Sequence, residues 1–322
     1  MSRSMNADQP PATWPGPIGR PERPHWWSIQ PPPPSSPISA RRAYTEVLAV
    51  FAAFFAAGII AGGETLAGRY PAPSGSWSVF VPATVTELAT AGLAIAVTVL
   101  LSARRGISPR SLGFGLARNS DGSAAAGPAF RQGVWALAAL IAGSVITRAV
   151  TANHLTEPAH ISSAYLLYST AASLAAGVVE ETVVLAFVVT TLRQAGRPLA
   201  EIVIVAVVLR CSYHDYYGPG VIGIAVWATI FIWLFLRTGS IVPLIITHFL
   251  WDATIFWSLQ YKGVAAGADL VALFLFLAAA ISWLADAIAS RGGGRPPPGG
   301  AGQAPTYTAW PYTEGHGSDR QY

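Results

Sequence analysis

Eight long apolar segments follow one another along this chain, and they constrain its fold more than any other feature. Each is about 18 to 30 residues long, close to the roughly 20 residues that a helix needs to cross a bilayer. The segments are residues 44–62, 79–102, 130–150, 163–192, 199–216, 220–237, 241–259 and 267–289. Within a hydrocarbon core a helix satisfies its own backbone polar groups. The sequence therefore predicts an all-α, polytopic membrane helical bundle of about eight transmembrane helices.

The composition supports a membrane protein and excludes several other classes. Hydrophobic residues make up 52% of the chain and charged residues 11%, whereas about a quarter of a typical soluble domain is charged. No basic run with interleaved aromatics points to nucleic acid as a partner. Cys211 is the single cysteine, so an intrachain disulfide and a cysteine-rich metal site are impossible. Lys262 is the single lysine among 20 basic residues, and this arginine bias, with much Ala, Gly and Pro, suggests a bacterial plasma membrane protein.

The two ends of the chain differ from its middle. Residues 1–40 are rich in proline, including Pro31 to Pro34, and are expected to form a disordered cytoplasmic arm. Residues 291–322 are rich in glycine and proline and are expected to form a disordered tail. We expect one transmembrane domain over residues 41–290, with its core motifs in residues 163–259.

The basic residues predict the orientation. If the N-terminus is cytoplasmic, 16 arginines fall on the inner side, and Arg69, Arg148 and Lys262 fall on the outer side. The inner arginines are Arg3, Arg20, Arg23, Arg41, Arg42, Arg104, Arg105, Arg110, Arg118, Arg131, Arg193, Arg197, Arg237, Arg291, Arg295 and Arg320. Because positive charge accumulates on the cytoplasmic side of membrane proteins, both termini are expected inside.

The fourth segment is unusual in its length and its charge. Its 30 residues would form a helix of about 45 Å, longer than a hydrocarbon core of about 30 Å, so tilt, a kink at Gly177 or a lead-in turn is expected. Near its centre lie two adjacent carboxylates, Glu180 and Glu181. A charged residue at this depth is expensive, which makes it a candidate functional residue with a partner inside the bundle.

Two later segments carry polar residues that can meet the glutamate pair. Arg210 and His214 lie four residues apart in the fifth segment, and His248 and Asp252 lie four residues apart in the seventh. This spacing places each pair on one face of a helix. Counting at about 1.5 Å per residue from the cytoplasmic ends puts the polar positions at comparable depths. We expect them to converge in one cavity.

Such a cavity is suited to hydrolysis. Glu180 or Glu181, with His214 beside it, can take a proton from water as a general base. His248, oriented by Asp252, can then donate to the developing oxyanion. A Cys211–His214 nucleophile pair is disfavoured, because residues three apart on one helix rarely reach that geometry.

These motifs resemble those of the CAAX protease and bacteriocin-processing family, also called the Abi family. The resemblance covers about residues 100–260 and includes the linker from Arg104 to Gly113. It implies an eight-helix bundle whose central four helices enclose the site, and an intramembrane peptidase acting on peptide or membrane-protein substrates.

Two positions depart from the family pattern. The first motif usually has an arginine where this chain has Leu185, followed by a glycine where it has Ala186. The second motif usually has a phenylalanine where it has Arg210. We interpret Arg210 as the replacement cation, paired with one carboxylate of the glutamate pair. This arrangement resembles a variant subset whose second motif reads Arg-x-x-Tyr-His.

The sequence leaves the cofactor and the activity open. A metal-independent mechanism is favoured, since the zincin His-Glu-x-x-His string is absent. A zinc ion bound by Glu181, His214 and His248 is the alternative. The chain can also be a catalytically inactive scaffold or an immunity-type peptide-binding protein that keeps the site as a polar core. A transporter with a proton-relay glutamate is a third possibility, although no internal repeat supports it.

Overall fold

The computed structural model describes residues 37–67, 76–115, 126–151 and 162–261, together with Ile29 and scattered residues between 263 and 284. Every regular element in these ranges is helical, which confirms the all-α prediction. The elements are α1 (Ala40–Leu66), α2 (Trp77–Ala103), α3 (Ala126–Thr151), α4 (Ser163–Glu180), η1 (Glu181–Val189), α5 (Thr190–Gln194), α6 (Leu199–Ser212), η2 (Asp215–Gly220), α7 (Val221–Thr238) and α8 (Val242–Gln260). Of the predicted arm, residues 1–40, only Ile29 and residues 37–40 are described, and the predicted tail, residues 291–322, lies outside the described residues.

Six helical stretches in the described part of the chain are long and apolar enough to cross a membrane. The chain is therefore an integral membrane protein, and the predicted count of about eight is approximate. The fifth predicted segment, 199–216, contains only the 14-residue helix α6, and its length of about 21 Å is shorter than the hydrocarbon core. Most of the eighth, 267–289, lies outside the described residues, although Gly267 and Val271 are helical.

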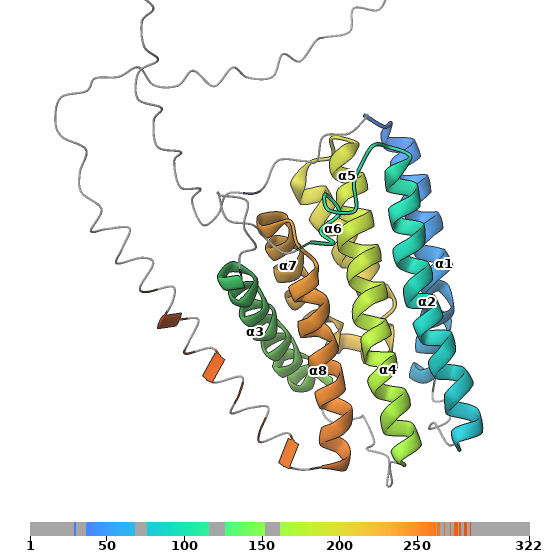
Figure 1. Ribbon diagram of the computed structural model, residues 1–322, viewed down its shortest axis with the longest axis vertical. Coiled ribbons are helices and arrows are strands. Elements are labelled where there is room, and N and C mark those ends of the chain that lie inside the picture. The colour runs from blue at the N-terminus through green and yellow to red at the C-terminus, as the bar shows by residue number, and fades with distance from the viewer. Residues whose placement is uncertain are drawn as a thin grey trace, which may run out of the picture. The chain divides into compact units, whose positions relative to one another are not determined.

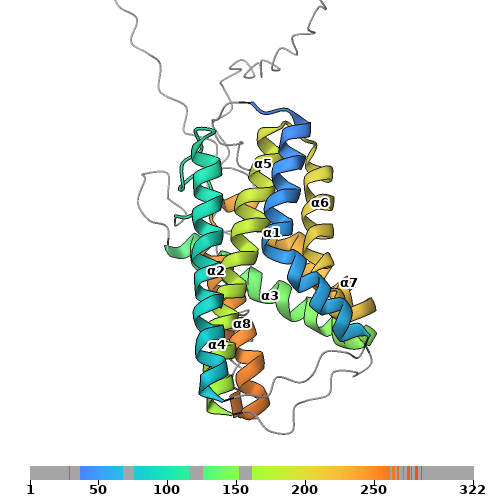
Figure 2. The same ribbon diagram turned by 90° about the vertical axis from the view of Figure 1, so that its right-hand side faces the viewer.

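Helix α4 lies between α2 and α8, and α3 packs against both α8 and α7 (Figure 1). A view turned by 90° shows that α3 is inclined to α4 (Figure 2), and α1 contacts α5, η1 and η2. Gly177 allows the close approach of α4 to α8, because a Cβ there would lie 3.0 Å from the Ile245 carbonyl oxygen. The glycine that was expected to kink the fourth segment thus serves a helix contact.

The fourth segment is continuous from Ser163 to Gln194. Its centre, η1, is a nine-residue π-helix, and every residue in it is buried. It contacts α1, α2, α6 and α7. π-Helical turns are rare and occur frequently at functional sites, so η1 is a candidate functional segment. Its first residue is Glu181.

The linker after α2 closes one end of the bundle. Gly113 has φ of +92°, and its carbonyl oxygen accepts from the backbone N–H of Ile241, 3.1 Å away. A Cβ at this glycine would lie 2.9 Å from the Phe235 ring and 3.2 Å from the Gly239 carbonyl oxygen. Only glycine combines this backbone conformation with this close approach. The linker therefore packs against the turn between α7 and α8.

Candidate active site

Glu181 is the centre of the polar contacts inside the bundle. Its two carboxylate oxygens accept from the two terminal nitrogens of Arg210, each at 2.9 Å, which is a bidentate ion pair. Its Oε1 also lies 2.8 Å from Nδ1 of His248. The Glu181 side chain is completely buried, and Arg210 is 1% exposed. Both oxygens of this buried carboxylate therefore accept hydrogen bonds from Arg210 or His248.

Glu180 is placed differently from its neighbour. Its Oε2 accepts from the hydroxyl of Tyr213 at 2.9 Å, and it lies 3.9 Å from the nearest Arg210 nitrogen. Its side chain retains 12% of its accessible surface, whereas that of Glu181 retains none. Glu180 is therefore the less enclosed carboxylate of the pair.

His248 connects both glutamates to α8. Its Nε2 lies 4.0 Å from Oε2 of Glu180 and 3.4 Å from Oδ2 of Asp252, one helical turn further along α8. Nδ1 is held by the shorter contact to Glu181. Nε2 is thus the less tightly held nitrogen of the ring. We call Glu180, Glu181, Arg210 and His248 the inner cluster.

His214 lies just beyond the end of α6. Its Nδ1 is 3.0 Å from the carbonyl oxygen of Arg210. Since a carbonyl can only accept, Nδ1 carries a proton in this contact, and Nε2 of the neutral ring has a free lone pair. The ring lies 4.6 Å from that of Tyr213, between centroids, and 6.2 Å from that of Trp227. Its placement is that of a fixed tautomer with one basic nitrogen.

The structure brings Glu180, Glu181, Arg210, His248 and Asp252 into one connected set, and His214 joins it through the Arg210 backbone. The arginine position of the usual first motif, Leu185, is completely buried in η1. Arg210 approaches the glutamate pair from α6 instead.

Sequence reasoning missed two residues that contact this set. Tyr213 donates to Glu180, and Trp227 stacks on Arg210 with 4.6 Å between the guanidinium carbon and the ring centroid. Tyr213 stands next to the motif histidine, and its position there was the signal available. Trp227 lies on α7, and no local pattern in the sequence relates it to α6.

The residues do not fit a zinc ion as they are arranged. Glu181 already accepts from Arg210 with both oxygens, and a cation beside it opposes a second one. In the part of the chain that the structure describes, His, Cys, Asp and Glu side chains do not converge in a group of three or more suited to a metal.

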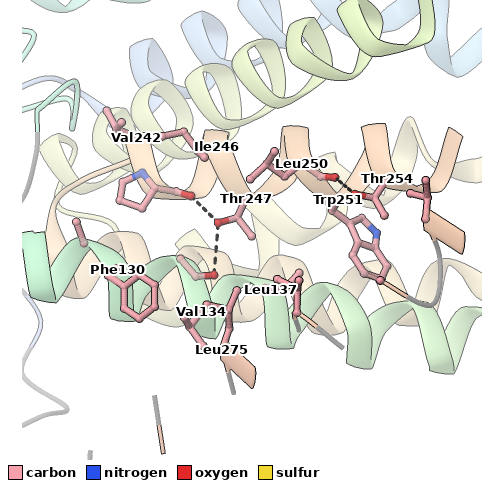
Figure 3. A pocket seen from close by; sticks show the side chains of 16 residues that line it. Phe130, Val134, Leu137, Val242, Ile246, Thr247, Leu250, Trp251, Thr254 and Leu275 are labelled. Atoms are coloured by element: carbon pink, nitrogen blue, oxygen red, sulfur yellow. Dashed lines mark hydrogen bonds between the residues drawn. The ribbon is translucent and has the colours of Figure 1, made fainter. Parts of the chain in front are cut away.

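The opposite face of α8 carries an apolar groove. Its volume is about 620 Å³, and it lies between α3 and α8 (Figure 3). Labelled lining residues include Val134, Leu137, Ile246 and Leu250. The Thr247 hydroxyl, also in the wall, donates within α8 to the Pro243 carbonyl oxygen at 2.8 Å. The polar and apolar surfaces of α8 are thus separated, with His248 and Asp252 on one and the groove on the other.

Comparison with known proteins gives one match. Residues 162–254 match the family model of type II CAAX prenyl endopeptidase Rce1-like proteins. Neither a curated protein nor a solved structure matched the chain. The matched range begins at the cap of α4 and ends in α8 just after Asp252, so it contains all six predicted site residues. The match supports the resemblance to the CAAX protease and bacteriocin-processing family that the motifs indicated, over residues 162–254.

Proposed function

We propose that this protein is an intramembrane endopeptidase that hydrolyses peptide bonds of membrane-associated proteins or small peptides. The family match supports a CAAX-protease-like hydrolase. The observation that carries the mechanism is the asymmetry of the glutamate pair, in which Glu181 is completely buried against Arg210 and His248 and Glu180 keeps 12% of its side-chain surface exposed.

In this mechanism Glu180 is the general base. It takes a proton from a water molecule, and the resulting hydroxide attacks the scissile carbonyl carbon. The basic Nε2 of His214 accepts a hydrogen bond from the same water. When the tetrahedral intermediate collapses, Glu180 returns the proton to the leaving amine, so that one water is consumed and two chain ends are formed.

His248 supplies the oxyanion contact. Its Nδ1 is fixed on Glu181, while Nε2 faces Asp252 at the longer distance of 3.4 Å. With both ring nitrogens protonated, Nδ1–H donates to Glu181 and Nε2–H can donate to a developing negative charge, which is the kind of preorganised donor that stabilises such a charge. Glu181 and Arg210 hold the ring in place. No metal is needed in this scheme.

Orientation is part of the proposal. Arg41, Arg104, Arg197 and Arg237 lie at the start of α1, the end of α2, the start of α6 and the end of α7, and we assign this end of the bundle to the cytoplasm of a bacterial cell. The orientation can be tested with single cysteines in a Cys211→Ser background. Cysteine at position 41 should react only after the membrane is permeabilised, and reaction before that step would reverse the assignment.

The function is tested by the substitution Glu180→Gln. We expect cleavage to fall by about 10²–10⁴-fold, because glutamine keeps the hydrogen bond from Tyr213 but cannot take a proton. The readout is mass spectrometry of membrane peptides from cells with the wild-type or variant protein. Glu201→Gln, at the start of α6 and remote from the site, is the matched control. Identical peptide pools for wild type and Glu180→Gln would favour the inactive scaffold.

A further inference from the structure

One aromatic ring contacts three of the site residues. Trp227, in α7, has its ring centroid 4.6 Å from the guanidinium carbon of Arg210. The same ring lies 5.4 Å from the imidazole of His248, at 65°, and 6.2 Å from that of His214, at 89°. Trp227 is 4% exposed. A single side chain on α7 therefore touches groups from the end of α6 and from α8.

The ring complements what Glu181 does for Arg210. A guanidinium donates hydrogen bonds only in its own plane, and here two terminal nitrogens donate to Glu181. Its flat faces have no donors, and in a dry interior they lose their contact with water. An aromatic face attracts a cation through its quadrupole, most strongly when the pair is desolvated. Glu181 thus holds the edge of Arg210, and Trp227 holds its face.

The Trp227 ring is also held in place by α3 and by Phe231. A Cβ added at Gly143 of α3 would lie 2.6 Å from Cδ1 of Trp227 and 2.6 Å from the carbonyl oxygen of Gly223. The Phe231 ring meets Trp227 at an edge, with centroids 5.0 Å apart. Because glycine at 143 provides just enough room, the indole cannot withdraw from the site without moving α3.

We propose that Trp227 is a positioning residue of the active site, which sets the geometry of Arg210, His214 and His248 through direct ring contacts. This inference rests on the proposed peptidase function for its kinetic readout. The indole touches no reacting atom, and it acts by limiting the orientations of the two imidazoles and the guanidinium. If Trp227 only filled space, any large apolar side chain would serve equally well.

The test compares Trp227→Phe with Trp227→Leu in the full chain in detergent. Both variants lose volume, but only phenylalanine keeps an aromatic face. We expect kcat for peptide cleavage to fall about tenfold in the leucine variant, with KM within about twofold of wild type, and to recover most of its value in the phenylalanine variant. Trp233→Leu is the matched control, because Trp233 lies on the same helix and stacks on Arg237 at 5.5 Å, away from the site. The control should cleave like wild type.

A second readout is independent of activity. In protein with labelled histidine, the imidazole signals of His214 and His248 should each split or broaden in Trp227→Leu, and stay single in Trp227→Phe and Trp233→Leu. Single signals for both histidines in Trp227→Leu, or equal kcat for the leucine and phenylalanine variants, would overturn the proposal. If the wild type cleaves nothing, the peptidase function fails and the histidine signals alone decide the role of Trp227.

Discussion

Two guanidinium–carboxylate clusters can be compared in the part of the bundle that the structure describes, and they differ in how deeply their ion pairs are buried. The inner cluster joins Arg210 to Glu181, 29 residues away, in complete burial. The other, which we call the end cluster, consists of Tyr44, Glu46, Arg105, Arg197 and Glu201. There Arg197 pairs with Glu201 one helical turn away, and both side chains remain about one third exposed, at 34% and 27%.

The difference teaches what each cluster can do. In the end cluster Arg105 donates to the Thr191 hydroxyl and pairs with Glu46 at 3.4 Å, which ties the end of α2 to α5 and α1. Burial also lowers the pKa of the Arg105 guanidinium. Such contacts fasten helix ends that water can still reach. In the inner cluster the Arg210–Glu181 pair is completely buried, so water cannot readily replace a lost partner and the pairing defines the geometry of the site.

The largest effect is expected for Arg210→Leu. Removing one partner of a buried pair leaves the other charge uncompensated, which costs about 3–5 kcal/mol of unfolding free energy. SDS titration of the purified protein measures this. The double variant Arg210→Leu/Glu181→Leu should recover part of the loss. A single variant as stable as wild type would mean that the ion pair contributes nothing to the fold.

Arg210→Lys should have an intermediate effect. Lysine keeps the charge but cannot form the two parallel bonds to Glu181 or stack flat on Trp227. We expect a loss of about 1–3 kcal/mol by the same titration, together with weaker cleavage. Equal stability and activity for the lysine variant would show that charge alone is sufficient.

Arg105→Gln tests the end cluster at its most buried member. Glutamine can keep one hydrogen bond to Thr191 but loses the pairing with Glu46, and we expect a loss of about 1–2 kcal/mol. Cleavage should be unchanged once the protein is folded. If cleavage falls as far as in Glu180→Gln, the end cluster acts on the site, and the contrast between the two clusters is wrong.

The smallest effect is expected for Arg197→Ala. An exposed pair of residues one helical turn apart contributes little, because water and salt replace the lost partner. The melting temperature in detergent should stay within the error of the measurement at both low and high salt. A clear drop would show that Tyr44 and Glu201 depend on this arginine for their own contact.

The sequence alone determined the helical membrane fold, the order of the site motifs and the cation at position 210. Membrane spans can be predicted from sequence because each must be apolar over the whole thickness of the bilayer, which requires a continuous run of about 20 apolar residues. The length of α6 was harder to predict. Its apolar run continues towards His214, but the helix ends at Ser212, before the turn formed by Gly218 and Pro219.

Only the tertiary structure decided how the two adjacent glutamates divide their roles. The sequence treats Glu180 and Glu181 alike, since they are the same residue type at the same depth. Their side chains point in different directions from the start of a π-helix, so one meets Arg210 and His248 while the other meets Tyr213. The contact with Trp227 depends equally on tertiary packing, because Gly143 of α3 sets where α7 can lie. Such contacts join residues remote in the chain, and no local pattern encodes them.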